Sequence, residues 1–175
     1  MLDEGYAAVS ARRVAQKAGL KFQLVHYYFR TMDELFLEVF RRRAEEGLQE
    51  QERALASERP LQALWNFSLD PTGTALTMEF VGLANHRKAI KAEIARYAEL
   101  IRARQLEALS GLLERHELSA VLPPSSLLVL LTSVSRMVAL EQALGMSIGH
   151  AELLTAVEKH LQHFEEDTKS SDAAP

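Results

Sequence analysis

The residues best suited to chemistry lie in the first quarter of the chain, and that chemistry is attraction to a polyanion. Residues 1–43 contain eight Lys and Arg residues against five Asp and Glu residues, a net charge of +3. The rest of the chain carries −7, so the overall charge of −4 conceals two parts of opposite sign. A basic segment can approach a polyanion such as nucleic acid, whereas an acidic segment is repelled by it. The eight cations are Arg12, Arg13, Lys17, Lys21, Arg30, Arg41, Arg42 and Arg43.

Catalytic chemistry has no comparable support in the sequence. The chain contains no Cys, which excludes disulfides, thiolate metal sites and Cys nucleophiles. It also shows no nucleophile elbow, no Gly-rich phosphate loop and no Glu-x-x-His pair with a matching partner. His160 and His163 lie one turn apart beside acidic residues, but they flank an apolar seam, which favours an interface pair over a metal site. We therefore expect a non-enzyme with no cofactor and no bound metal.

Two short helices separated by a glycine must position the basic segment. Ser10 precedes a helical run, Gly19 follows it where a left-handed cap is required, and a second helix is expected over about Phe22–Tyr28. This layout is that of a helix-turn-helix, whose second helix enters the major groove of DNA. The apolar residues expected to hold the two helices together are Val14, Ala15, Ala18, Leu20, Val25 and Phe29.

The rest of the chain has helical periodicity and no strand pattern, so we expect an all-α fold. Thr31 and Glu34 fit a capping box at the start of a third helix, which runs to about Ala56. Asp70–Gly73 is expected to be a loop. Further helices are expected from Pro60, over Leu76–Leu83, 88–116, about Ser126–Leu144, and Leu154–Phe164. No window of about 18 apolar residues is recognised, so we expect no membrane contact.

Apolar residues surround nearly the whole helix between Leu127 and Leu140, so one neighbouring helix cannot cover it. Two copies packed across a two-fold axis would form a four-helix bundle that can. Arg136 and Glu141 lie beside this stripe and could pair across the interface. The residues expected at the dimer interface are Leu127, Leu131, Val134, Met137, Leu154, Val157, Leu161 and Phe164.

The N-terminal pattern resembles the TetR family of one-component transcriptional regulators. The resemblance covers about 35 residues in order and spacing: Gly5-Tyr6, Ser10, Val14-Ala15, Ala18-Gly19-Leu20, Val25, Tyr28-Phe29 and Asp33-Glu34-Leu35. It implies a helix-turn-helix domain at 1–43, a helical effector-binding and dimerisation domain at 44–167, and a disordered tail at 168–175. In that family a complete first helix precedes the Gly-aromatic pair. Only Met1 to Glu4 precede it here, so we expect either a native start further upstream or a bundle that lacks most of one helix.

The same resemblance implies roles for individual residues. Ser10 caps a helix and contacts a phosphate, and Gln23 is suited to read adenine through its amide. Met32 occupies a position where the family usually has Lys, a loss that Arg30 partly replaces. The run Arg41–Arg43 is more readily interpreted as a solvated helix face than as a DNA contact. The expected DNA-binding residues are Ser10, Arg12, Lys21, Phe22, Gln23, Leu24, His26, Tyr27, Tyr28 and Arg30.

The function expected from this resemblance is that of a cytoplasmic, ligand-responsive repressor. It would bind double-stranded DNA as a homodimer on a palindromic operator, and its effector would be a small apolar or amphipathic molecule. Residues suited to line a pocket are Trp65, Phe67, Met78, Phe80, His86 and Tyr97, although core packing or helix surface is the simpler interpretation of each. A helical protein-interaction module without DNA binding stays open as an alternative, and a helical-bundle enzyme is less favoured.

Overall fold

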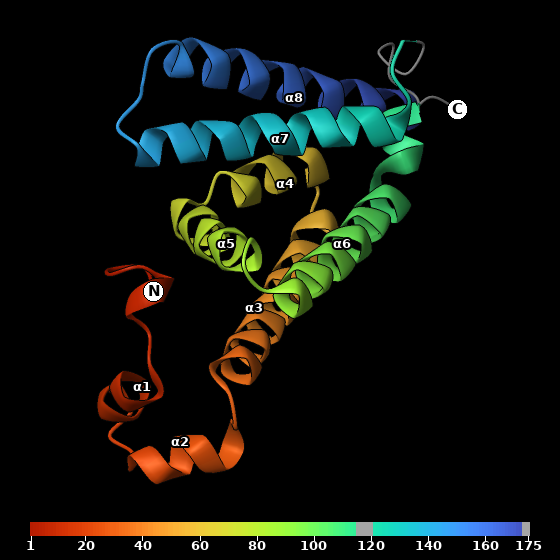
Figure 1. Cartoon of the computed structure of the whole chain (residues 1–175). Coiled ribbons are helices and arrows are strands. Elements are labelled where there is room, and N and C mark those ends of the chain that lie inside the picture. Colours follow the sequence, from red (N-terminus) through yellow and green to blue (C-terminus); the bar gives the residue numbers. More distant parts are fainter. Residues whose placement is uncertain (115–120, 173–175) are drawn as a thin grey trace. The chain divides into compact units, whose positions relative to one another are not determined.

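The chain is built entirely from helices in the part that the structure, a computed structural model, describes: residues 1–114 and 121–172 (Figure 1). The all-α expectation is therefore confirmed. A short 3-10 turn, Tyr6–Ala8, precedes the first α-helix. The helices are α1 (Ala11–Lys17), α2 (Phe22–Tyr28), α3 (Met32–Leu55), α4 (Pro60–Ser68), α5 (Pro71–Ala84), α6 (Lys88–Glu114), α7 (Pro124–Ala143) and α8 (His150–Asp172).

Two helices begin earlier than the sequence analysis expects, and prolines explain both. Asp70–Gly73 is not a loop, because α5 already begins at Pro71. The Asp70 carboxylate caps this helix by accepting from the backbone N–H of Thr72 at 3.2 Å and of Gly73 at 2.6 Å. Similarly, α7 begins at Pro124 instead of Ser126. Proline lacks an N–H and has a helix-compatible φ, so it suits the first helical position.

At its other end, α8 continues to Asp172, past the expected start of a tail at Thr168. No Pro or Gly interrupts the chain between these two residues, so nothing forces the helix to stop there. The remainder of that tail, 173–175, lies outside the described residues, as do 115 and 116 at the end of the helix expected over 88–116.

The chain divides into two compact units. Unit 1 comprises Met1–Gly47 and Ala75–Glu99, and unit 2 comprises Leu48–Thr74 and Leu100–Pro175. The unit that contains α1 and α2 thus also includes most of α5 and the first half of α6. The functional division near residue 43 stays a prediction.

Unit 1 has an apolar core that joins α3, α5 and α6. Phe36, Phe80, Leu83 and Ile90 are its fully buried members. Tyr6 seats the N-terminal segment on α5, because its backbone N–H donates to Glu79 Oε2 at 2.5 Å. Its ring also passes so close to Gly82 that a Cβ there would lie 3.2 Å from the ring edge. A glycine at position 82 therefore permits this approach.

Unit 2 has its own apolar core, to which α4, α6, α7 and α8 contribute. Its buried members are Leu61, Leu64, Trp65, Leu109, Leu113, Leu127, Leu128, Leu161 and Phe164. By length and composition alone α7 could cross a membrane, which the sequence analysis did not recognise. That is weak support for a span, because core helices of soluble proteins meet the same criterion. Leu128 and Val138 of α7 are indeed buried within the protein.

A buried carboxylate from α8 caps the start of α4. Glu165 is 3% exposed, and its Oε1 accepts from the backbone N–H of Leu61 at 2.8 Å and of Gln62 at 3.3 Å. The first N–H groups of a helix have no partner within the helix, and a negative charge there is favourable. This contact joins residues 104 positions apart in the sequence and fixes α4 to α8.

We expect Glu165→Ala to lower the free energy of unfolding by about 1–3 kcal/mol, because two buried backbone donors lose a charged acceptor. Urea denaturation of the full chain measures this. Glu158→Ala, at an exposed position of the same helix, serves as the matched control and should change stability little. Equal effects of the two substitutions would show that the cap does not stabilise unit 2.

Candidate nucleic-acid interface

The turn between α1 and α2 is fixed by hydrogen bonds around Gly19. Ser10 caps α1, accepting from the Arg13 backbone N–H at 3.4 Å. At the other end, Leu20 N–H donates to Ala15 C=O at 2.8 Å and Gly19 N–H donates to Gln16 C=O at 3.2 Å. This pair of bonds is a Schellman motif, which requires a left-handed residue. Gly19, with φ +66°, supplies it at no steric cost. The expected cap and turn are both present.

Three buried side chains hold the helix-turn-helix together. Ala15 on α1 is 2% exposed, Val25 on α2 is 6% exposed and Leu35 on α3 is 7% exposed. Val25 is the only buried residue of α2. The packing of α2 therefore uses a single position and leaves the rest of the helix available to a partner.

The exposed surface of α2 carries the residues expected to read DNA. Lys21, which precedes it, and Phe22, Gln23, Leu24, His26, Tyr27 and Tyr28 are all exposed. Tyr27 is 78% exposed and Tyr28 67%, with their rings in edge contact at 5.3 Å between centroids. Phe22 contacts the His26 ring in the same manner at 4.5 Å. A shallow open depression on this face is lined by Gly19, Leu20, Lys21, Gln23, Leu24 and Tyr27.

Acidic side chains neutralise most of the cations in residues 1–43. Glu4 pairs with Arg13, and Asp3 lies 4.0 Å from Lys17. Glu93 pairs with Arg41 at 2.7 Å, and Glu46 pairs with Arg42 at 3.3 Å and Arg43 at 2.9 Å. Hydrogen bonds from Arg43 and then Arg42 lower the pKa of Glu46. The run Arg41–Arg43 is thus paired with carboxylates.

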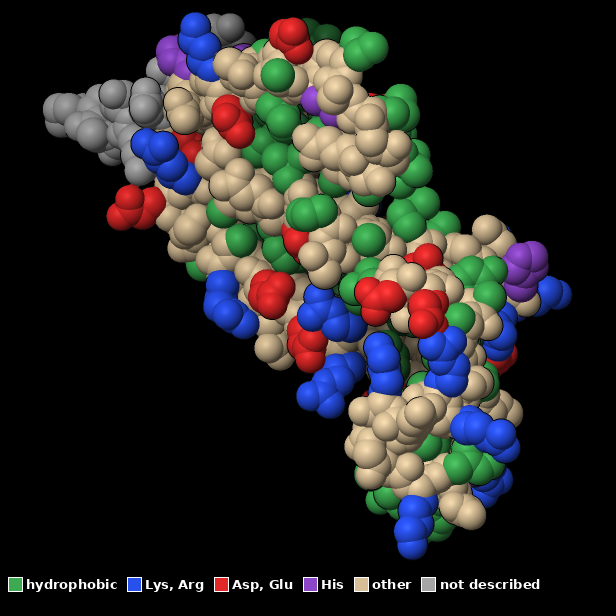
Figure 2. All heavy atoms as spheres, turned by 90° about the vertical axis from the view of Figure 1, so that its left-hand side faces the viewer, with side chains coloured by type: hydrophobic (Ala, Val, Ile, Leu, Met, Phe, Trp, Pro, Cys, Tyr) green, Lys and Arg blue, Asp and Glu red, His purple; other side chains and the backbone are tan. Residues whose placement is uncertain are grey.

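Three cations of this segment have no ion pair among the described residues: Arg12, Lys21 and Arg30. All three belong to the expected DNA-binding set. Figure 2 shows Lys and Arg side chains over the part of the surface that carries α1 and α2, low in the view. A Lys or Arg side chain without an ion pair inside the protein is available to neutralise a phosphate group of a nucleic-acid backbone.

The start of α3 positions Arg30. Thr31 Oγ1 accepts from the Glu34 N–H at 3.2 Å, and Glu34 Oε2 accepts from the Arg30 N–H at 2.8 Å. This is close to the expected capping box, with the return bond one residue earlier than expected. Met32, at the position where Lys was expected from the resemblance, is half-buried and packs against the unit 1 core.

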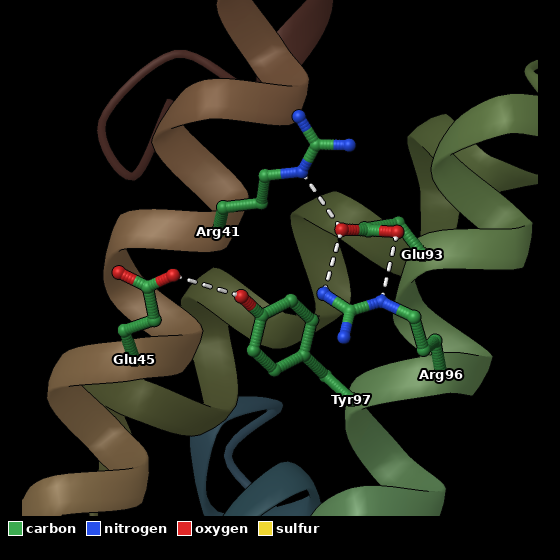
Figure 3. Close-up of polar contacts among 5 residues, drawn as sticks. All are labelled: Arg41, Glu45, Glu93, Arg96 and Tyr97. Carbon is green, nitrogen blue, oxygen red and sulfur yellow. Dashed lines mark hydrogen bonds and ion pairs between the residues drawn. The ribbon is translucent and has the colours of Figure 1, made fainter.

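A polar network that the sequence does not predict links α3 to α6 within unit 1 (Figure 3). Glu93 accepts from Arg41 Nε at 2.7 Å, from Arg96 Nη2 at 2.9 Å and from Arg96 Nε at 3.2 Å. Tyr97 OH bonds to Glu45 Oε1 at 3.1 Å. The hydrogen bonds from Arg96 and Arg41 lower the pKa of Glu93 to about 2. Local patterns could not reveal contacts between residues about 52 positions apart.

We expect Glu93→Gln to destabilise the chain near pH 6 and to do so less as the pH falls. Because the folded-state pKa of Glu93 lies below its ordinary value of 4.5, its stabilisation is complete above about pH 4.5. That stabilisation is lost as the pH falls toward 2. Urea denaturation at several pH values measures the difference. Glu99→Gln, at an exposed position of α6, is the control, and a difference that stays constant with pH would contradict the network's role.

The six expected pocket residues fall into different units. Trp65 and Phe67 lie in unit 2, whereas Met78, Phe80, His86 and Tyr97 lie in unit 1. Phe80 and Tyr97 are buried and both contact Phe40, at 5.2 and 5.7 Å between ring centroids. Met78 and His86 are exposed. Neither unit alone brings the six together.

The expected dimer-interface residues also differ in their surroundings. Leu127, Leu161 and Phe164 are buried in the core of unit 2. Leu131, Val134, Leu154 and Val157 are half-buried against the same core. Met137 alone of the eight is exposed, at 53%.

Comparison with known proteins finds a family similarity in the N-terminal segment. Residues 1–39 match the sequence model of a family described as bacterial regulatory proteins, tetR family. The match spans α1, α2 and the first turns of α3, which are the elements that carry the exposed face described above. No curated protein and no solved structure matches the chain.

Proposed function

We propose that this chain, whose N-terminal segment is a TetR-family helix-turn-helix domain of a DNA-binding transcription regulator, acts as a homodimeric, ligand-responsive repressor on a palindromic operator. The observation that carries the proposal is the exposed face of α2, flanked by unpaired cations. On this face Gln23 is suited to contact base edges, and Lys21, Arg12 and Arg30 are suited to contact phosphates. Phosphate contacts set affinity and salt dependence, whereas base contacts set sequence preference.

A partly uncovered stripe on α7 supports the dimer. Leu130 is 55% exposed, Met137 53% and Leu144, the residue that follows the last residue of α7, 70%. Together with Ser126, Ser133 and Leu140 they follow spacings of four and three residues, which is the seam of a helix pair. The interface that we propose is therefore this outer stripe of α7, next to the largely buried residues named from sequence. A two-fold axis through this stripe would present the two copies of the helix-turn-helix, α1 and α2, to the two halves of a palindromic operator.

A response to an effector requires that a change in unit 2 alter the position of α1 and α2, which lie in unit 1. The helices α3 and α6 each contribute residues to both units. An effector that binds one arrangement of these helices more tightly shifts the population toward it. Repression then depends on whether the favoured arrangement matches the spacing of the operator half-sites.

We expect the full chain to bind DNA taken from beside its own gene in a salt-sensitive, sequence-preferring manner. Lys21→Ala should reduce the slope of log affinity against log salt by about 1, because one phosphate contact is lost. Fluorescence anisotropy at several salt concentrations measures this. Lys159→Ala, at an exposed position on α8, should leave the slope unchanged.

Gln23→Ala should instead weaken specific binding by about 1–3 kcal/mol while binding to unrelated DNA stays the same, since a base contact carries sequence information. Competition between operator and scrambled DNA measures the ratio. Absence of any sequence preference in the unaltered chain would contradict the proposed function.

We expect Met137→Glu to convert the dimer to a monomer, because two buried copies of an unpaired carboxylate would face each other across the axis. Sedimentation velocity measures the mass. The control is Met78→Glu, at a methionine that is 42% exposed in unit 1. A wild-type chain that is monomeric at micromolar concentration, or a Met137→Glu variant that stays dimeric, would exclude this interface.

A further inference from the structure

The loop that joins α7 to α8, residues 144–149, presents apolar side chains to solvent (Figure 1). Ile148 is fully exposed, Leu144 is 70% exposed and Met146 is 53% exposed. The loop contains no charged residue. Exposed apolar side chains that gather in one place mark a surface that binds a partner.

Hydrogen bonds hold this loop in one conformation. At its start, Gly145 N–H donates to Gln142 C=O at 3.0 Å and Met146 N–H donates to Glu141 C=O at 2.9 Å. The Glu141 side chain also hydrogen-bonds, at 2.7 Å, to Nε2 of His150, the first residue of α8. A surface that is already ordered loses little conformational entropy when it binds.

The opposite end of α7 is also apolar and uncharged. Val121, just before the helix, is 78% exposed, and residues 121–135 contain no charged side chain. The 20 residues of α7 span about 30 Å, so Val121 and the α7–α8 loop cannot cover each other within one chain. A second copy of α7 that runs alongside in the opposite direction covers both ends at once.

The outer stripe of α7 favours this antiparallel direction. Its members are symmetric about position 135: Ser126, Leu130, Ser133, Met137, Leu140 and Leu144. Antiparallel pairing about that position sets Ser126 against Leu144 and Ser133 against Met137, so that each small residue meets a large one. Parallel pairing sets serine against serine and Met137 against its own copy. Small residues opposite large ones let two faces interdigitate, and the antiparallel direction also brings the helix dipoles into favourable alignment.

Building on the dimer proposed above, we propose that the α7–α8 loop of one copy docks on the start of α7 in a second copy. Ile148 and Met146 then contact Val121 of the partner subunit, and the two-fold axis repeats this contact at the other end of the paired helices. A lipid surface is the other apolar partner to consider. The loop has neither the aromatic nor the basic side chains that anchor proteins at a membrane surface, which favours the second copy.

The chain has no Cys, so disulfide trapping can detect this contact without background. In the double variant Val121→Cys/Ile148→Cys, the length of α7 separates the two thiols of one chain by far more than a disulfide can span, which is about 7 Å between Cα atoms. Any disulfide therefore joins two chains. On oxidation of the full-length double variant we expect a covalent dimer on a non-reducing gel. Val121→Cys alone and Ile148→Cys alone should stay largely uncrosslinked.

Ile148→Glu tests whether the contact stabilises the dimer. Because Ile148 is fully exposed within its own chain, we expect the helix content by circular dichroism to be unchanged. The dissociation constant of the dimer should rise at least about tenfold, because a carboxylate would be buried against an apolar surface. Sedimentation velocity over a concentration series measures this constant. Val81→Glu, at an exposed valine of unit 1, is the matched control and should leave it unchanged.

The contact is overturned if a dimeric double variant yields no covalent dimer, if Ile148→Cys alone cross-links as completely, or if Ile148→Glu leaves the dissociation constant unchanged. Binding to phosphatidylcholine vesicles that Ile148→Glu abolishes, with the dimer intact, would assign the loop to a lipid surface instead. Binding to operator DNA is measured on the same preparations. A dimer that binds its operator but does not cross-link contradicts this contact alone. A cross-linked dimer without sequence preference contradicts the proposed function alone, and a monomeric wild-type chain contradicts both.

Discussion

The orientation of α2 in the helix-turn-helix depends on one left-handed residue, Gly19. Helix α2 has seven residues, which is too short to be stable alone in water. It is held by the hydrogen bonds around Gly19 and by the packing of Val25 against its neighbours. Because so little of α2 is used for packing, its remaining side chains are free to contact a partner. For the same reason the backbone conformation of Gly19 largely determines the orientation of α2, since few other contacts could restore it.

Acidic residues determine which cations remain for a polyanion. Counting charges in residues 1–43 suggests a broadly basic surface, but most of these cations are paired within the protein. Among the described residues the pairing leaves Arg12 in α1, Lys21 at the start of α2 and Arg30 after the end of α2. The Arg41–Glu93–Arg96 network has a different consequence, because it joins α3 to α6 within unit 1. Charge in this segment therefore links α3 to α6 and leaves three cations for the proposed contact with DNA.

Much of the fold could be predicted because it is encoded locally. Ser10, Gly19 and Thr31 act through bonds to residues within five positions of them, and periodicity alone located most helices. The Asp-Pro pair at 70–71 is typical of a loop, but it also suits a helix cap followed by a first helical residue, and this is how α5 begins. The expected pocket residues share a chemical type but no sequence pattern, and the structure distributes them over two units. Which apolar residues face inward also depended on neighbours remote in sequence, as for Leu127 and Phe164.

Gln105 is buried one turn before Leu109, at a position where the helical period calls for an apolar residue. The most direct test of the proposed DNA recognition by α2 is Gly19→Val. An added Cβ at this position meets no neighbouring atom, so the substitution strains only the backbone conformation. Competition binding between operator and scrambled DNA should show loss of sequence preference in this variant, with the overall helix content by circular dichroism nearly unchanged. Undiminished preference for the operator in Gly19→Val would contradict the account.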